Sequence, residues 1–371
     1  MATSEYLYTS CRIIVGRLAS VLIPSDNFKT EYWIDDKYKL KFLGYSFSRP
    51  LYIDSEIYIF YKRGNLFKSV QNQITLLSQL TLEDLMYCDM VRVGKWFALR
   101  SGGTIRVSND LVNWKVIYSG KRGIKDSMIA LEKVGKPILI FIEYSTGHNK
   151  GSHRVLQYEF DNGALTTLKV FYSAEAHKVS GIEPFARHIH VISLDPFTGD
   201  IYIGTGDKND ESNIYVSHDN GDSFILLAGG NQSFRTLSFF FTEESIFWNT
   251  DTHESQSIIR LNRKNIDLHK IVIRKFPLIN GALWCTIKTK LKDGTSFIIM
   301  SSNSEGATYD NFNRLYGIVI KDETPIVYEL AKFFSLSCYS QAFPIGKDAS
   351  DFYYFYDTRF NLIEKCKLVQ I

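Results

Sequence analysis

Two histidines, His188 and His190, lie two residues apart in the run His-Ile-His-Val-Ile-Ser. If this run is a β-strand, both imidazoles face the same side, because alternate side chains of a strand point to opposite faces. Ile189 and Val191 would then point into packing. A neutral imidazole could remove a proton or activate water. The same pair could instead supply two metal ligands, or be hydrogen-bonded in a wall without any chemistry.

A carboxylate and a phenol could serve as acid and base near these histidines. Glu143 ends the apolar run Ile138–Ile142, and a carboxylate that leaves a dry strand can have a raised pKa, although it could equally be a solvated strand end. Tyr144 could donate or accept a proton, or stack on a ring of a ligand. A metal at the histidine pair is the minor alternative, and we expect no cofactor. The side chains that could complete such a metal site are those of Glu143, Asp207, His148 and His153.

Cationic and polar side chains could hold an acidic ligand at the same place. Arg187 directly precedes His188, and Arg235 opens a later strand-like run. A guanidinium matches a carboxylate with two hydrogen bonds, so both arginines are candidate clamps. Asp207 could be part of the site or simply the polar end of a strand. The further side chains that could bind substrate, or be merely solvated, are those of His148, His253, Tyr309 and Arg314.

Charge and composition exclude several classes of partner. The net charge of +3 is small and spread along the chain, so no electrostatic footprint of a nucleic-acid or anionic-membrane partner is visible. The five cysteines form no CxxC pair, which favours buried free thiols in a reducing compartment. No signal peptide or membrane-spanning run is recognisable. The sequence therefore predicts a cytoplasmic protein without membrane insertion, and leaves the oligomeric state open.

The elements that must position these residues are short strands. Aromatic residues make up 14% of the chain, many of them beside β-branched residues, which favours strands over helices. About four short strands recur every 40 to 50 residues, the period of propeller blades. We therefore expect one all-β domain over residues 1–371, a seven-bladed β-propeller, with six or eight blades as alternatives. The expected blades are Phe42–Leu80, Met86–Ser119, Ser127–Phe171, His188–Leu227, Arg235–Lys275, Gly281–Leu330 and Ser337–Ile371.

The last of these units shows only three strands before the chain stops. An N-terminal strand near Arg12–Val15 could supply the fourth and close the ring without an unpaired edge. Long polar loops on consecutive blades suggest a cleft over blades three to six, because binding residues concentrate on loops held by a rigid scaffold.

One tight turn carries a resemblance to a known family. In Ser217-x-Asp219-x-Gly221, followed by Phe224, the carboxylate can accept backbone hydrogen bonds and the glycine can take a positive φ. This pattern resembles the Asp-box, or bacterial neuraminidase repeat, of sialidase-like β-propellers. A second copy without the glycine begins at Ser108. The sequence lacks the early Arg motif of sialidases, since Phe47-Ser48-Arg49-Pro50 misses its spacing.

The resemblance implies a carbohydrate-active protein, and histidine and tyrosine at the mouth are similar to propeller lyases that cleave uronic-acid polysaccharides. We therefore expect an enzyme that cleaves an acidic glycan by hydrolysis or elimination, with His188, His190, Glu143 and Tyr144 as catalytic residues. The alternative is a non-catalytic propeller that binds a glycan or a protein in a surface-polysaccharide pathway.

Overall fold

The computed structural model describes most of the chain from residue 38 onward. The described residues are 38–71, 73–84, 87–144, 153–172, 186, 188–252, 256–267, 271–277, 283–291, 294–302, 312–334, 342–348, 350, 352–357 and 362–370. No helix in these segments has the length and apolar character needed to span a bilayer.

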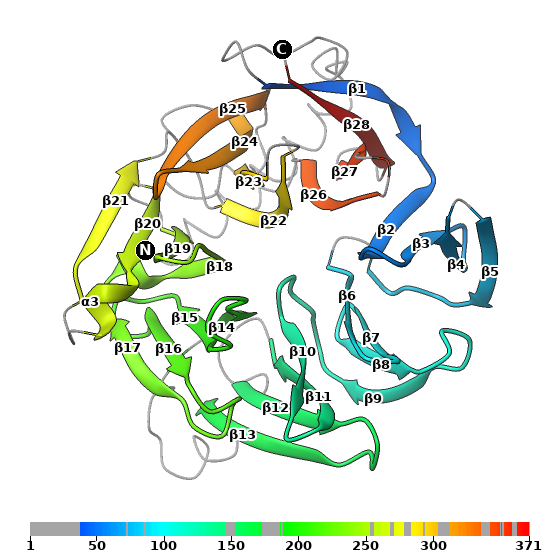
Figure 1. Ribbon diagram of the computed structural model, residues 1–371, viewed down its shortest axis with the longest axis horizontal. Coiled ribbons are helices and arrows are strands. Elements are labelled where there is room, and N and C mark those ends of the chain that lie inside the picture. Colours follow the sequence, from blue (N-terminus) through cyan, green and yellow to red (C-terminus); the bar gives the residue numbers. More distant parts are fainter. Residues whose placement is uncertain are drawn as a thin grey trace, which may run out of the picture. The chain divides into compact units, whose positions relative to one another are not determined.

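The chain is a seven-bladed β-propeller of four-stranded antiparallel sheets (Figure 1), as the strand period predicts. The first two sheets are β2 (Ser48–Ile53), β3 (Tyr58–Lys62), β4 (Asn65–Val70) and β5 (Gln73–Gln79), then β6 (Asp89–Val93), β7 (Trp96–Ser101), β8 (Thr104–Ser108) and β9 (Lys115–Ser119). The third and fourth are β10 (Met128–Lys133), β11 (Lys136–Ile142), β12 (His153–Glu159) and β13 (Leu165–Tyr172), then β14 (His188–Leu194), β15 (Ile201–Gly206), β16 (Asn213–Ser217) and β17 (Ile225–Gly229). The fifth and sixth are β18 (Thr236–Phe241), β19 (Ser245–Thr250), β20 (Ser257–Asn262) and β21 (Ile273–Pro277), then β22 (Leu283–Lys290), β23 (Ser296–Ser302), β24 (Phe312–Lys321) and β25 (Thr324–Phe334).

The seventh sheet takes its fourth strand from the N-terminal side of the chain. It contains β26 (Ala342–Lys347), β27 (Phe352–Asp357) and β28 (Leu362–Gln370), and β1 (Tyr38–Ser46) pairs with β28. An N-terminal strand therefore completes the last blade, as expected, but it is β1 and not the segment Arg12–Val15, which lies outside the described residues. Phe42, expected to open the first blade, belongs to this closing strand instead.

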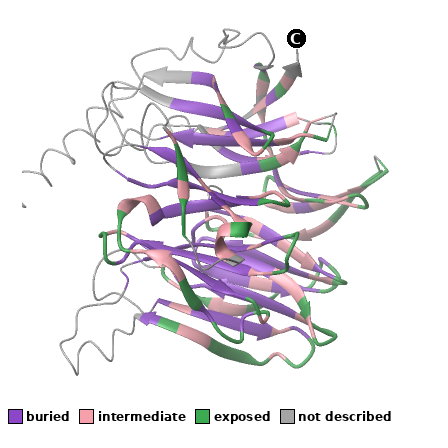
Figure 2. Cartoon of the chain, turned by 60° about the vertical axis from the view of Figure 1, so that its left-hand side comes forward, coloured by how far each residue is buried: buried purple, intermediate pink, exposed green. Residues whose placement is uncertain are grey.

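Burial falls from the first three strands of a sheet to the fourth. In the fourth sheet every residue of β15 and β16 is buried, whereas β17 begins with two exposed residues, Ile225 and Leu226. Figure 2 shows the same change from buried to exposed along the sheets. Strands that are apolar on both faces are typical of sheets packed on both sides, which is why the middle strands read as continuous apolar runs.

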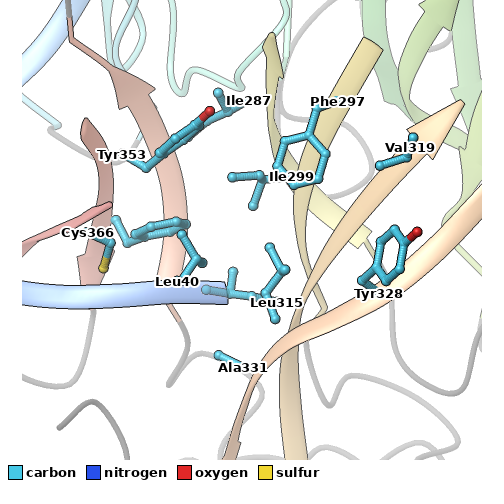
Figure 3. Packing of buried hydrophobic residues seen from close by; sticks show 12 residues of the cluster. Leu40, Ile287, Phe297, Ile299, Leu315, Val319, Tyr328, Ala331, Tyr353 and Cys366 are labelled. Carbon is cyan, nitrogen blue, oxygen red and sulfur yellow. The ribbon is translucent and has the colours of Figure 1, made fainter. Parts of the chain in front are cut away.

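Two compact units make up the chain. The first contains the described residues of 1–63, 251–258 and 276–371, and the second contains those of 64–250 and 259–275. The first unit has a core around Phe297, Leu315 and Tyr353 that joins the sixth and seventh sheets (Figure 3). The second has cores around Phe141 and around Trp248. A single domain over the whole chain stays a prediction.

The turn at Ser217 is stabilised by the hydrogen bonds that its sequence predicts. The Ser217 hydroxyl donates to Asp219 Oδ1 (2.7 Å) and accepts from the Gly221 amide (2.8 Å), and Gly221 has a φ of 91°. The Asp219 carboxylate also accepts from the amide and hydroxyl of Ser223, which lowers its pKa to about 2. Phe224 is buried beneath this turn.

The copy that lacks the glycine forms a related turn. Ser108 donates to Asp110 (2.9 Å) and accepts from the Leu111 amide (2.8 Å). Leu111 takes a φ of 65°, so a non-glycine residue carries the left-handed conformation in this turn. The motif therefore specifies a β-hairpin turn in both copies.

Candidate functional site

The site lies in the second unit, at the start of β14. His188 Nε2 is 3.2 Å from Asp207 Oδ2, and His190 Nε2 is 3.4 Å from Asp207 Oδ1. The two rings stack with centroids 5.8 Å apart, so both imidazoles face the same side, as the spacing predicts. The ladder between β14 and β15 shifts register between Ile189 and Val191, which leaves His190 as the extra residue of a β-bulge.

Asp207 is placed by the loop between β15 and β16. The Glu211 carboxylate accepts hydrogen bonds from the amides of Asp207 (3.1 Å) and Lys208 (3.4 Å). The Gln232 side-chain amide donates to the Asp207 carbonyl (2.9 Å). Hydrogen bonds therefore fix both the backbone amide and the backbone carbonyl of Asp207, and its carboxylate faces the two histidines.

Arg235 approaches the same carboxylate from the next sheet. A short 3-10 helix, η2 (Gln232–Phe234), precedes it and is capped by the Asn231 side chain, which accepts from the Ser233 amide. The Trp248 indole fixes this helix by donating to the Ser233 carbonyl (2.7 Å). Arg235 follows directly and places Nη2 3.1 Å from Asp207 Oδ1.

Gly206 makes this close assembly sterically possible. A Cβ at this position would lie 2.9 Å from His190 Cε1 and 2.9 Å from Arg235 Cγ, closer than real Cβ contacts come. The bare backbone of Gly206 therefore allows the imidazole and the arginine stem to meet beside Asp207.

The electrostatics of the cluster keep Asp207 ionised. Burial by itself would raise the pKa of Asp207, but hydrogen bonds from His188 and His190 outweigh it and hold the pKa well below its usual range. An ionised carboxylate only accepts hydrogen bonds, so the Nε2 atom of each facing imidazole carries the proton. The other ring nitrogen, Nδ1, is then the one that can accept a proton. Neither Nδ1, on His188 or on His190, has a hydrogen-bond partner among the described residues.

Burial also disfavours charge on the neighbouring imidazoles. It lowers the pKa of His190 against the opposing attraction of Asp207. His153, at the start of β12, contacts His188 edge-to-face with ring centroids 6.0 Å apart. Burial, together with the nearby His188, lowers the pKa of His153 to about 4. Both rings are therefore neutral near pH 7.

Tyr144 joins the cluster through its ring. It stacks on His188 with centroids 5.2 Å apart and planes 23° apart. The two roles predicted for Tyr144, proton exchange and stacking on a sugar ring, stay predictions.

Glu143, the residue before Tyr144, belongs to a different set of contacts. Its carboxylate accepts two side-chain hydrogen bonds from Arg154 (2.8 and 2.7 Å) and one from the Tyr118 hydroxyl (2.9 Å). Among the described residues its hydrogen bonds and ion pairs involve only these two side chains and the Arg154 backbone. Neither partner was expected from the sequence, because each comes from a different strand.

The remaining sequence candidates are not brought to this cluster by any described contact. Arg314 lies in the first unit, where it pairs with Glu329 at 2.9 Å. The candidates that lie outside the described residues are Arg187, His148, His253 and Tyr309. No group of three or more His, Cys, Asp or Glu side chains in the described segments is arranged to hold a metal ion. A metal at the histidine pair stays a prediction.

Comparison with known proteins identifies a fold and no family. No protein-family model matches the chain, and no curated protein matches it. Among solved structures it is similar to "YCF48 bound to D1 peptide", with a TM-score of 0.51 and 10% identity over 91% of this chain and 99% of that one. It is also similar to the extracellular domain of the putative hybrid two component system BT4673 from B. thetaiotaomicron, with a TM-score of 0.50 and 13% identity over 89% of this chain and 40% of that one. At these identities the likeness shows the β-propeller fold alone, and the Asp-box resemblance rests on its turn residues.

Proposed function

We propose that this propeller is a carbohydrate-active enzyme that cleaves an acidic glycan at the cluster of His188, His190 and Asp207. The observation that carries the proposal is the single carboxylate facing both Nε2 atoms, at 3.2 and 3.4 Å. It orients both imidazoles with Nε2 toward the carboxylate, so Nδ1 is the nitrogen that can act as a general base. The Asp-box turn at Ser217 supports the proposal, because propellers with this turn include carbohydrate-active enzymes.

Elimination fits these residues better than hydrolysis. Glycosidases commonly use two carboxylates that flank the scissile bond. Asp207 is occupied by two imidazoles and Arg235, and Glu143 is occupied by Arg154 and Tyr118. An imidazole base is the group that the described part of the site offers for proton abstraction.

In the proposed reaction Nδ1 of His188 takes the proton from the carbon next to the sugar carboxylate. The electron pair of that C–H bond forms a double bond to the neighbouring carbon, and the bond from that carbon to the glycosidic oxygen breaks. The leaving oxygen keeps the bonding pair and takes a proton from the Tyr144 phenol, which water later restores. Proton transfer of this kind typically contributes about 10²- to 10⁴-fold to a rate.

The test is turnover of a panel of uronic-acid polysaccharides by the full chain. Elimination produces a conjugated double bond that absorbs ultraviolet light, whereas hydrolysis produces new reducing ends without that absorbance. We expect His188→Gln and Asp207→Asn to lose about 10²- to 10⁴-fold in kcat. The matched control is His218→Gln, because His218 pairs with Asp200 at 2.9 Å on the same sheet but is exposed. Full turnover by His188→Gln would refute the assignment.

The rival function is a propeller that binds a glycan or a protein without cleaving it. One observation favours it: the Nδ1 atoms of His188 and His190 are buried, so a substrate must displace covering atoms to reach them. The similar YCF48 structure is described as a peptide complex, which also fits a binding role. Saturable binding of an oligosaccharide or peptide without turnover of any glycan in the panel would favour this rival.

A further inference from the structure

The guanidinium of Arg122 lies over two tyrosine rings beside the proposed site. Its guanidinium carbon lies 5.4 Å from the ring centroid of Tyr87 and 5.8 Å from that of Tyr144. Tyr144 in turn stacks on His188. A guanidinium over an aromatic face is attracted to it by a cation–π interaction, so both rings contribute to holding Arg122 in place. Arg122 is therefore one stacked ring away from the proposed base.

Glycines bring the Arg122 segment to this position. A Cβ on Gly103 would lie 2.1 Å from the Gly120 carbonyl oxygen, and a Cβ on Gly123 would lie 2.0 Å from the Gly102 carbonyl oxygen. Only bare backbone fits there, so the segment before β10 packs directly on the turn between β7 and β8. An antiparallel bridge between Arg122 and Tyr144 completes the attachment.

Arg122 has no carboxylate partner among the described residues. Among the described residues its guanidinium makes no ion pair and no hydrogen bond, and its side chain keeps partial exposure. Four other arginines of the unit form ion pairs with carboxylates. The pairs are Arg106 with Glu83, Arg154 with Glu143, Arg235 with Asp207, and Arg263 with Asp195. A rigid, partly exposed guanidinium without a counter-ion is suited to binding an external anion.

We propose that Arg122 is a specificity-determining residue that binds the carboxylate of an acidic sugar. The guanidinium carbon lies over both tyrosine rings, and a carboxylate binds a guanidinium at its edge. At the edge, two parallel N–H groups match the two oxygens of a planar carboxylate. This proposal rests on the proposed glycan site, and it assigns the acid preference of that site to Arg122.

The test is calorimetric binding of oligogalacturonate and of its methyl ester to the full chain. The parent protein should bind the acid more tightly than the ester. Arg122→Gln should lose roughly ten- to a hundredfold in affinity for the acid and little for the ester, because a bidentate charged hydrogen bond is lost. Arg122→Lys should also lose most of the preference, since an ammonium cannot form the planar pair.

Arg92→Gln is the matched control, because Arg92 also lies over an aromatic ring, that of Phe97 at 5.4 Å, but on another part of the neighbouring sheet. It should keep the parent's acid preference. An unchanged acid preference in Arg122→Gln overturns the assignment even if the enzyme cleaves glycans. A further probe is an oligosaccharide of neutral sugars that carries sulfate groups in place of carboxylates. If it binds the parent as tightly as the acid does, and its affinity falls equally in Arg122→Gln, the planar carboxylate is overturned as the ligand.

The two proposals fail separately. Acid-selective binding that depends on Arg122, without any turnover, supports the carboxylate site and refutes the enzyme. A parent protein that binds neither the acid nor the ester refutes the carboxylate site as well.

Discussion

Acidification is expected to destabilise this protein through His153, and the effect is removable by one substitution. His153 is 2% exposed and lies beside His188, and burial lowers its pKa from 6.5 to about 4. Replacement by Gln keeps a polar side chain of moderate size but removes the titrating ring. The variant should therefore lose a defined part of the acid sensitivity of the parent.

The sign follows from which state takes up the proton first. Between the ordinary pKa of about 6.5 and the folded value of about 4, the unfolded chain binds a proton at His153 that the native state does not. The free energy of unfolding therefore falls as the pH falls through this window. For a group with these two pKa values the loss between about pH 7 and about pH 4.5 is roughly 2 kcal/mol. Burial of His190 acts in the same direction.

Asp207 does not contribute to this window. Its folded pKa is depressed, so the stability it provides is fully present above the unfolded value of about 3.9 and is lost only at lower pH. Urea unfolding followed by tryptophan fluorescence at about pH 7 and about pH 4.5 measures the difference. We expect His153→Gln to reduce the acid-induced loss by roughly 2 kcal/mol. The control is His218→Gln, at an exposed histidine, which should lose as much stability on acidification as the parent. If His153→Gln also loses as much stability as the parent, the reasoning is refuted.

Two further substitutions test the geometry of the site. Gly206→Ala places a Cβ 2.9 Å from His190 Cε1 and Arg235 Cγ, so we expect a loss of about 1–3 kcal/mol in unfolding free energy together with a fall in glycan binding or turnover. Chemical denaturation measures the stability and calorimetry measures glycan binding. Unchanged binding in Gly206→Ala would show that the contact of Gly206 with His190 and Arg235 is not tight. Glu143→Gln weakens the contacts with Arg154 and Tyr118, so we expect a stability loss of about 1–2 kcal/mol with turnover intact. Lost turnover at unchanged stability would instead support the catalytic role that the sequence predicts for Glu143.

Strand period was sufficient to predict the propeller and most blade boundaries. The first six expected units each hold four of the observed strands, although the last strand of several runs past the predicted end, and the seventh holds three, because polar turns separate short apolar runs along the chain. The closing strand was misassigned because local sequence does not say which of two N-terminal apolar runs pairs with β28. That choice depends on contacts with the far end of the chain, as in the pairing of Leu40 with Leu368.

The shared direction of His188 and His190 was predictable from their spacing, but the role of Asp207 was not recognised. A signal was present, since counting outward from the turn pair Leu194 and Ile201 brings Asp207 opposite His188 in a regular ladder. The bulge at His190 moves the partner of His188 to Gly206, and bulges cannot be read from residue types alone. Arg122 was missed because its two tyrosines are distant in sequence.

The residues of the site come from three consecutive sheets. The sequence of any one sheet is therefore not enough to predict how they are arranged. Tyr144 follows β11 of the third sheet, His188 and Asp207 lie in and just after strands of the fourth, and Arg235 directly precedes the fifth. The fourth and fifth sheets meet where a Cβ on Gly204 would lie 2.4 Å from Thr236 Cγ2, so their spacing is fixed by bare backbone. The charge balance at Asp207 is therefore set by the packing between sheets. A ligand that displaced Arg235 or His188 from this carboxylate would have to work against that packing.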